Sequence, residues 1–531
     1  MTIVCETKVI LDVGLLEGEV KLSKLVVGLF FFVWITLDIA IGLCLPLRKL
    51  AFGMPYLLVM EIINIGIAYD VVLLFCVSFL KKSGDPPKLG RLDRSPPVAL
   101  LYLSCNDAMP EALSRLNNQA YENYRIFVLD DSTDEAYRAM VESYDYDIIS
   151  RGHRRGAKAG AINNWLALYG DQFEYFVVLD HDGITENTFI EEMLKYAEHP
   201  DNAQVAIFQS LTKAWNTARL FPRLIDAMHT LEMRLHMQVF NQSDSMLCWG
   251  HNMLCRVKPF QEIDGFIEDF ATEDFATNLH LIECGYQSKA VNVISYDTAS
   301  ETAQFHAMRI TRWASGNLEV AISKSWDLPL ATRLRMFMGV HCFSEWFFYV
   351  LGMLLSVWGY RVTWKQLQVI TFFAFRWHTP VLVWYPLAII LLYILYGIVF
   401  RPYWVTRLIG ISWQDYWGHS ILRMAVNYYA LFHIFTGQVK SLLGRKARFI
   451  IGEKRWFPSS LWDIVRGMRW TMVVIGFIAV GLVWNPVGRV VHFIWYIPLF
   501  LSPLIVHWVQ NVAVEEGARG MDSLPEIPSG E

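Results

Sequence analysis

Three pairs of acidic residues stand out in the polar middle of the chain, each where a short apolar run ends or a helical pattern begins. They are Asp130 with Asp131, Asp180 with Asp182, and Glu273 with Asp274. Neighbouring carboxylates repel one another and raise each other's pKa. A divalent cation that bridges the carboxylates to a phosphate removes that cost, because Mg²⁺ and Mn²⁺ prefer oxygen ligands. The three pairs therefore predict a site for a metal ion and a phosphorylated ligand.

Asp180 and Asp182 have the spacing that best suits a metal. Side chains two residues apart on an extended segment point the same way, so both carboxylates can reach one cation and the diphosphate it carries. An isolated Asp-x-Asp is more often part of a turn. The prediction therefore depends on acids recurring at three such places.

The segment RGHRRGAKAGAINNWL, residues 151–166, lies between the first two acidic pairs and opens with a compact basic group. Its glycines at 152, 156 and 160 allow the backbone to approach a ligand closely. Cations beside a helix N-terminus favour an anion. We expect the segment to bind phosphate, with a solvated basic loop as the alternative.

A parallel α/β sheet would bring these groups together. Runs rich in β-branched and aromatic residues alternate with helical patterns over 110–121, 134–143, 185–199 and 275–283. The predicted strands cover 98–107, 124–132, 146–152, 175–183 and 203–210. Ligands of such sheets bind outside the carboxyl ends of the strands, which is where the acids fall.

The composition indicates a globular domain mounted on membrane helices. Of the 531 residues, 54% are apolar, and 20 are tryptophan. The formal net charge of −5 lacks the basic footprint of nucleic-acid binding, so we exclude that partner. The eight cysteines form no C-x-x-C pair, which argues against a zinc site and against a disulfide framework.

Six apolar segments approach the length of about 20 residues that a bilayer-spanning helix needs. They are 25–45, 56–80, 337–358, 381–400, 469–486 and 490–511. Lysine and arginine crowd the end of the second span and the stretch 401–469, whereas the loop 359–380 holds three. The excess of positive residues on the inner side of membranes places 84–330 and 401–468 in the cytosol.

The predicted fold is thus a membrane α-helical bundle with a cytosolic α/β domain and amphipathic interface helices. Residues 413–435 mix aromatic and polar side chains at helical spacing, as interface helices do, although a cytosolic helix packed on the domain fits too. The predicted segments are a cytosolic N-terminus 1–24, two spans in 25–80, the cytosolic domain with an interface helix 84–330, two spans in 337–400, interface helices and a further loop 401–468, two spans in 469–511, and a polar tail 512–531.

Seven short motifs follow one another along the polar middle of the chain, and their order is informative about its family. They are S-x-N-D at 104–107, D-D at 130–131, H-R-R-G-A-K-A-G-x-x-N at 153–163, D-x-D at 180–182, W-G-x-N at 249–252, T-E-D at 272–274 and R-x-x-R-W at 309–313. This order resembles that of the processive family-two glycosyltransferases, among them cellulose, curdlan, chitin and hyaluronan synthases. The resemblance implies a GT-A fold with a Rossmann-like mixed sheet.

The resemblance also implies how a UDP-sugar donor is held. Asp107 and Asp131 would contact the uridine with Lys158 nearby, while Asp180 and Asp182 would hold Mg²⁺ or Mn²⁺ on the diphosphate. The full set of expected donor-binding residues is Ser104, Asn106, Asp107, Asp130, Asp131, Lys158, Arg309 and Arg312.

For the chemistry, the resemblance implies Asp274 as the general base, with Glu273 beside it. Arg312 would neutralise the leaving UDP, and Trp313 would stack on the terminal sugar of the acceptor. One carboxylate acting as base without a covalent intermediate predicts inversion at the anomeric carbon.

The segment W-G-H-N resembles the acceptor-site loop F-x-G-x-N of the same family. A sugar ring would lie on Trp249, although a core tryptophan is an equally good interpretation of that residue. The expected acceptor-binding residues are Trp249, Gly250, His251, Asn252 and Trp313.

One further segment indicates which branch of the family the chain resembles, and one further position departs from the family pattern. Residues 445–454 resemble the F-x-V-T-x-K gating loop of bacterial β-glucan synthases. Phe449 and Lys454 match the phenylalanine and the lysine of that pattern, but Ile-Gly-Glu stands where Val-Thr-x is usual. Arg309 stands where the family pattern has glutamine. Arginine accepts no hydrogen bond and keeps its charge, so it pairs with an acid such as Glu273, reaches the diphosphate, or reaches the acceptor.

The predicted function is an inverting, processive glycosyltransferase that polymerises UDP-glucose into a β-glucan and moves the product across the inner membrane. The alternatives are a hyaluronan- or chitin-type synthase using UDP-GlcNAc or UDP-GlcA, and a non-processive transferase to a lipid acceptor. A transporter or scaffold with a dead transferase domain would have no reason to keep all the acids. The predicted partners are the UDP-sugar, the growing polysaccharide and the lipid bilayer, and accessory subunits are compatible with this function.

Overall fold

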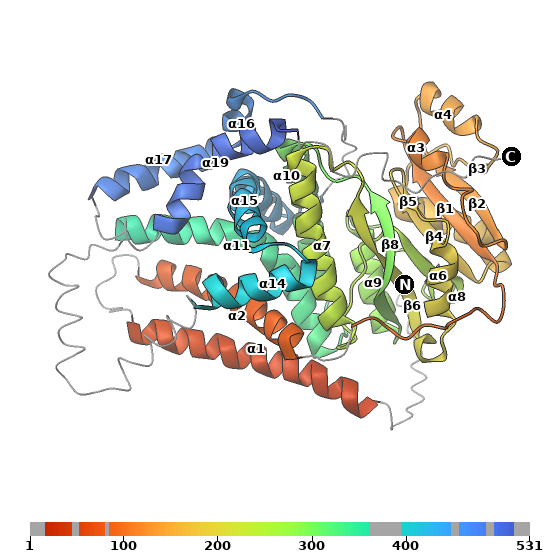
Figure 1. Ribbon diagram of the computed structural model, residues 1–531, viewed down its shortest axis with the longest axis horizontal. Helices are drawn as coiled ribbons and strands as arrows, with labels where there is room; N and C mark the ends of the chain where they lie inside the picture. Colours follow the sequence, from red (N-terminus) through yellow and green to blue (C-terminus); the bar gives the residue numbers. More distant parts are fainter. Residues whose placement is uncertain are drawn as a thin grey trace.

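The computed structural model describes residues 16–44, 53–79, 84–359, 395–447, 456–484 and 493–513. An α/β domain and a helical part lie side by side along the long axis of the molecule (Figure 1). The helices α7 (Leu220–Phe240) and α10 (Ala303–Ser323) run between the two parts. The site described below is therefore bounded by the sheet on one side and by helices on the other.

The sheet has eight strands in the order β3-β2-β1-β4-β7-β6-β8-β5. The pairs β1/β2, β1/β4, β2/β3 and β6/β8 are parallel, whereas β4/β7, β6/β7 and β5/β8 are antiparallel. The strands are β1 (Val98–Ser104), β2 (Tyr124–Asp130), β3 (Asp147–Ile149), β4 (Tyr175–Asp180), β5 (Ile184–Thr185), β6 (Val205–Ala214), β7 (Met253–Arg256) and β8 (Gln287–Asp297).

All five expected strands form, but the parallel sheet expected from the alternation of elements is wrong, and the mixed sheet implied by the family resemblance is correct. The antiparallel strand β7 is inserted between β4 and β6. It has only four residues, too few to show a pattern. The sequence analysis does not predict the long strand β8, because its sequence QSKAVNVISYD interleaves polar residues with the apolar ones.

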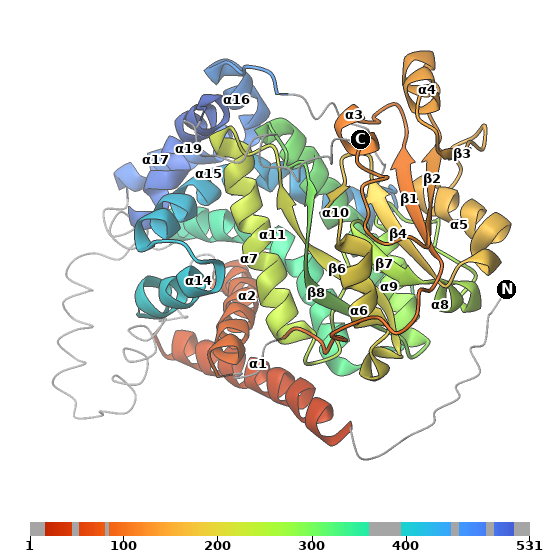
Figure 2. The same ribbon diagram turned by 45° about the vertical axis from the view of Figure 1, so that its right-hand side comes forward.

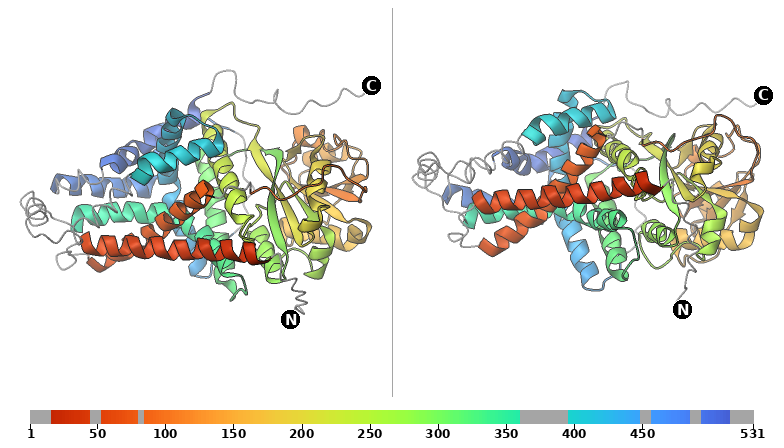
Figure 3. Two further views of the ribbon diagram at one scale, coloured as in Figure 1. Left: turned by 60° about the horizontal axis from the view of Figure 1, so that its bottom comes forward. Right: turned by 90° about the horizontal axis from the view of Figure 1, so that it is seen from below.

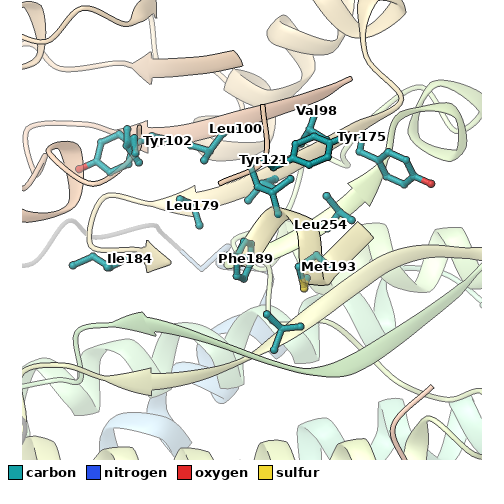
Figure 4. Packing of buried hydrophobic residues seen from close by; sticks show 14 of the residues in the cluster. Val98, Leu100, Tyr102, Tyr121, Tyr175, Leu179, Ile184, Phe189, Met193 and Leu254 are labelled. Carbon is teal, nitrogen blue, oxygen red and sulfur yellow. The ribbon is translucent and has the colours of Figure 1, made fainter. Parts of the chain in front are cut away.

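Helices cover both faces of the sheet, because the side chains of the central strands alternate between two buried layers. Leu100 and Tyr102 of β1 pack with Phe189 and Met193 on one face (Figure 4). The opposite face packs around Trp165. The helices of this domain are α3 (Pro110–Leu113), α4 (Glu135–Glu142), α5 (Ala157–Tyr169), α6 (Phe189–Ala197), α8 (Val257–Glu262) and α9 (Glu273–Glu283), with short 3₁₀ turns at Gly170–Gln172 and Pro200–Asn202.

The sheet meets the helical part through β6 and β8, which lie beside α7. Figure 2 shows this contact, with β2 and β3 at the far edge of the sheet. The helical part contains α1 (Leu16–Cys44), α2 (Gly53–Phe79), α11 (Leu330–Gly359), a π-helical turn (Tyr396–Phe400), α14 (Arg401–Ile409), α15 (Trp413–Leu442), α16 (Leu461–Gly467), α17 (Arg469–Trp484) and α19 (Phe493–Asn511).

Helix α15, which covers the expected interface segment 413–435, packs among α10, α11, α17 and α19. A Cβ placed on Gly437 would lie 2.6 Å from Thr311 Cγ2, so α10 and α15 approach closely. Phe435 of α15 stacks on Phe347 of α11 with ring centroids 3.6 Å apart. The packing fixes α10 firmly against the helical part.

Two of the described helices are long and apolar enough to cross a membrane, at Leu58–Val77 and Leu330–Leu355. The pair α16 and α17, bent by 83°, makes a third if it counts as one span. The expected spans 25–45 and 490–511 fall on helices α1 and α19, and Figure 3 shows α1 running beside the helical part toward the α/β domain. Most of the expected span 381–400 lies outside the described residues.

Candidate active site

The acidic motifs lie together because the carboxyl ends of β1, β2 and β4 are level. Ser104 pairs with Asp130, and Leu103 pairs with Asp180, in the register of the parallel strands. Strand β8 also ends at this edge, at Asp297, and β7 begins there because it runs antiparallel to β4. The sheet thus gathers the expected donor and acceptor residues along one edge.

Three of the expected donor-binding residues build the loops of this edge. The buried carboxylate of Asp130 accepts hydrogen bonds from Ser104 Oγ at 2.7 Å and Ser132 Oγ at 2.6 Å. Asn106, at φ 59°, accepts from the backbone N–H groups of Thr133 and Asp134 at 2.8 and 2.9 Å. Asp130, Ser104 and Asn106 therefore tie the ends of β1 and β2 together.

Asp131 and Asp107 each face a basic partner at the same edge. Asp131 forms a buried ion pair with Arg151, which also donates to the carbonyl oxygens of Arg155 and Ala157. Asp107 lies 3.4 Å from His181 Nδ1. Arg151, which follows β3, was part of the basic group in the sequence but not of the expected donor-binding set.

Lys158 links the segment expected to bind phosphate to the Asp-x-Asp motif. Its Nζ atom lies 2.5 Å from Asp180 Oδ1 and donates to the carbonyl oxygen of Gly250 at 2.8 Å. Burial alone would raise the pKa of Asp180, but the charges of Lys158 and His251 outweigh it and lower that pKa to about 2. Burial alone would lower the pKa of Lys158, and the nearby acids outweigh it and raise that pKa. Both groups are therefore charged at neutral pH.

Asp182 is buried and accepts hydrogen bonds from the backbone N–H and the hydroxyl of Thr298, directly after β8. Asp180 and Asp182 supply carboxylate oxygens, the donor type that Mg²⁺ and Mn²⁺ prefer. Among the residues the structure describes, no group of three or more His, Cys, Asp or Glu side chains is arranged to hold a metal ion. The two carboxylates fit a cation whose remaining ligands come from a bound diphosphate.

Helix α9 begins with Glu273 and Asp274, and Asp274 faces the loop before β7. A Cβ placed on Gly250, at φ 80°, would lie 2.3 Å from Asp274 Oδ2. Asp274 Oδ1 accepts a hydrogen bond from its neighbour's N–H at 2.8 Å. Burial and the charge of Asp274 raise the pKa of Glu273 to about 7. Gly250 thus touches both the donor side, through Lys158, and the carboxylate expected to act as base.

The loop 249–252 is held from several directions. The indole of Trp249 stacks on His236 of α7, with ring centroids 5.7 Å apart and planes 4° apart. Asn252 is fully buried at φ 49° and donates to the carbonyl oxygen of Tyr296 at 3.2 Å. His236 therefore covers one face of Trp249, and His229 meets the same ring edge to face with ring centroids 6.3 Å apart.

Helix α10 carries Arg309, Arg312 and Trp313 on one side. A Cβ placed on Gly316 would lie 2.7 Å from Thr272 Cγ2, so the helix presses against the start of α9. Arg312 donates to the carbonyl oxygen of Ala271 at 3.4 Å, and its charge acts on Glu273. Arg312 of the R-x-x-R-W motif is therefore held next to the acids of α9.

Asp297 is a charged residue of this edge that the sequence analysis missed. Its carboxylate oxygen Oδ2 lies 3.2 Å from His251 Nε2, and its charge acts on Arg309. The signal was present, because Asp297 ends a β-rich run just as Asp130 and Asp180 do. The acids acting on Arg309 are Asp297 and Asp182, whereas the sequence suggested Glu273.

The expected gating residues Phe449 and Lys454 lie outside the described part of the chain. The residues just before them rest on the α/β domain. The backbone N–H of Ala447 donates to Glu319 of α10 at 2.5 Å, and Lys446 Nζ lies 3.5 Å from the carbonyl oxygen of Asp269. The segment 445–454 therefore starts beside α10 and near the N-terminus of α9.

Comparisons with known proteins find a family match within the α/β domain. Residues 101–264 match the model of glycosyl transferase family 2. The chain is similar to two proteins named glucans biosynthesis glucosyltransferase H. One, from Cereibacter sphaeroides, is 26% identical over 186 residues, which cover 32% of this chain and 30% of that protein. The other, from Xylella fastidiosa, is 24% identical over 312 residues, which cover 51% of this chain and 48% of that protein.

The chain thus spans between about a third and a half of the length of these relatives. Among solved structures, a mannosyltransferase from Pyrobaculum calidifontis in complex with GDP-Man and Mn²⁺ has a TM-score of 0.48 and 15% sequence identity. The alignment covers 74% of this chain and 99% of that chain.

Proposed function

Because residues 101–264 form a family 2 glycosyltransferase domain, we propose that the protein transfers glucose from UDP-glucose, with inversion, to the end of a growing β-glucan. One observation carries the proposal. The loop residue Gly250 accepts a hydrogen bond from Lys158, which pairs with Asp180, and it lies against Asp274. A single residue, Gly250, therefore lies between the groups that would bind the diphosphate and the carboxylate that would activate the acceptor.

On the donor side, we assign Asp107 and Asp131 to the uridine and Lys158 to the diphosphate. Asp180 and Asp182 would hold Mg²⁺ or Mn²⁺, which supplies positive charge to the diphosphate as the bond to the sugar breaks. Lys158 and Arg312 add positive charge on the protein side, and a charge placed where negative charge develops stabilises the transition state.

On the acceptor side, Asp274 takes the proton of the attacking hydroxyl, and Trp313 stacks on the terminal sugar. Attack by the hydroxyl on the face opposite the leaving UDP converts an α-linked donor into a β-linked product. Burial and the charge of Asp274 raise the pKa of the neighbouring Glu273 to about 7, so Glu273 is protonated for much more of the time near neutral pH than an exposed glutamate is.

We further propose that the enzyme is processive and that the glucan leaves through the helical part. The acceptor residue Trp313 lies on α10, which packs directly on α15, and α15 in turn packs on the apolar helix α11. The similarity to proteins named for glucan biosynthesis supports glucose as the transferred sugar.

The test uses the purified full-length chain in lipid nanodiscs with Mg²⁺ or Mn²⁺. UDP-glucose, UDP-N-acetylglucosamine and UDP-glucuronate are supplied separately, and any polymer is digested with linkage-specific glycosidases. We expect a β-glucan from UDP-glucose alone. Polymer from the other donors would indicate a hyaluronan- or chitin-type synthase. UDP release with sugar transferred to lipid, and no polymer, would refute processivity.

A further inference from the structure

The imidazole of His251 is held between two oxygen atoms. Its Nδ1 atom lies 2.9 Å from the carbonyl oxygen of Trp249, and its Nε2 atom lies 3.2 Å from Asp297 Oδ2. A carbonyl oxygen and a carboxylate oxygen only accept hydrogen bonds, so both ring nitrogens must carry hydrogen. The geometry therefore makes His251 an imidazolium cation with Asp297 as its counter-ion.

Arg309 provides a second cation at this edge of the sheet. Its guanidinium lies over the ring of Trp313, 4.9 Å from the centroid. Asp297 and Asp182 are the two acids whose charges act on it. The buried Nε–H of Arg309 has no hydrogen-bond partner in the described part of the chain. A buried donor without a partner is costly, and at the edge of an active site it indicates that the partner arrives with the substrate.

The charges around Arg309 favour a neutral partner. The charges of two acids, Asp297 and Asp182, act on Arg309. A carboxylate such as Asp297 would repel a diphosphate. A sugar hydroxyl is neutral and can accept hydrogen bonds from both cations. Arg309 also lies on the indole proposed to carry the terminal sugar.

We propose that Arg309 and His251, with Asp297 as the counter-ion of His251, form an acceptor subsite that binds the hydroxyl groups next to the attacking hydroxyl. The inference deepens the proposed function and depends on it. Both cations only donate hydrogen bonds, so the sugar oxygens they contact must accept. The arginine closes one face of Trp313 and leaves the other for the sugar ring. Asp297 is a positioning residue, because it acts through His251.

The family glutamine would behave differently from Arg309 at this position. A glutamine amide donates and accepts, so it tolerates several orientations of a sugar hydroxyl, whereas a guanidinium selects one. The subsite therefore selects among acceptors that present their hydroxyl groups differently, and thereby influences the linkage of the product.

The test measures binding of oligosaccharides to the full-length chain in nanodiscs, saturated with UDP and Mg²⁺. The probes are glucohexaoses with β-1,2, β-1,3 or β-1,4 linkages, titrated by calorimetry. Arg309→Gln is expected to weaken binding of the preferred hexaose at least tenfold and to reduce the preference among linkages, and Arg309→Lys to be intermediate. Asp297→Asn should act in the same direction. UDP affinity should stay within twofold in each variant, which also verifies folding.

Arg125→Gln is the matched control, because Arg125 lies at the opposite end of β2 and pairs with Asp147. Hexaose binding that stays within twofold in Arg309→Gln would overturn the inference while leaving the proposed function intact. A loss of UDP affinity equal to the loss of hexaose affinity would also overturn it, since Arg309 would then serve the diphosphate. A wild-type chain that binds no hexaose and transfers sugar to lipid would instead refute the proposed function.

Discussion

Replacing Gly250 with alanine should misplace the proposed base without removing any catalytic group. The new Cβ would lie 2.3 Å from Asp274 Oδ2, whereas ordinary contacts begin at 3.4 Å, so the carboxylate must retreat by about 1 Å. A shift of about 1 Å in a catalytic group costs roughly 10²-fold in rate. We therefore expect kcat to fall about 100-fold, equivalent to about 2.7 kcal/mol of transition-state stabilisation.

Gly285 provides a control with the same backbone strain and no contact. Its φ is +88°, close to the +80° of Gly250, and a Cβ there would meet nothing within 4 Å. Both alanine variants lose about 1 kcal/mol or more of stability from the left-handed conformation. Only Gly250→Ala should lose turnover, because only its Cβ reaches Asp274.

The assay follows UDP release from UDP-glucose by the full-length chain in nanodiscs, together with UDP affinity. Lys158 donates to the backbone oxygen of Gly250, which alanine keeps, so UDP affinity should stay within about threefold. Turnover of Gly250→Ala within threefold of Gly285→Ala would refute the proposed role of Asp274. So would a parallel loss of UDP affinity and turnover, since the damage would then lie on the donor side.

Four further outcomes follow from the same geometry. Asp274→Asn should abolish synthesis and retain UDP binding, and residual turnover above about 1% would contradict its role as base. Lys158→Met leaves Asp180 buried without its cation and should weaken UDP binding at least tenfold in a fluorescence titration, with unchanged affinity as the contrary result. The pKa of Glu273 is about 7 in the folded chain and near 4.5 in the unfolded chain. The stability that Glu273 contributes is therefore fully present below pH 4.5 and is lost as the pH rises through 7. Glu273→Gln should therefore raise Tm by a few degrees at pH 8 and little at pH 4, and an equal shift at both would contradict this. Chelation by EDTA should stop transfer without lowering Tm, and Mg²⁺ or Mn²⁺ should restore it, whereas transfer that continues in EDTA would exclude a metal at Asp180.

The acidic edge could be predicted because it depends on local patterns. Each central strand is buried on both faces and therefore reads as an apolar run, and the first polar residue after it marks the strand end. Asp130 and Asp180 were located in this way, and the register of the strands places them level. The sequence analysis expected Gly156 to let the backbone approach a ligand, and the structure gives it a further role as the left-handed cap of α5, where a side chain would collide with Glu268.

The partners of those acids could not be predicted. Asp182 bonds to Thr298, and His251 to Asp297, across 116 and 46 residues of sequence. Strand β7 makes the contact between His251 and Asp297 possible, because its antiparallel insertion beside β4 brings the loop 249–252 to the same edge as the end of β8. A four-residue strand carries no periodic signal, so this insertion is invisible before the chain folds.

The sequence by itself determined which chemistry the protein can perform. Side-chain type and short-range spacing fix where carboxylates, cations and aromatic rings occur along a strand or helix, and these are properties of neighbouring residues. Only the tertiary structure decided which of them act together. Trp249 meets His236, Asp274 meets Gly250, and Arg309 lies over Trp313 while acting with Asp297, because sheet order and helix packing bring segments together whose separation no local rule encodes.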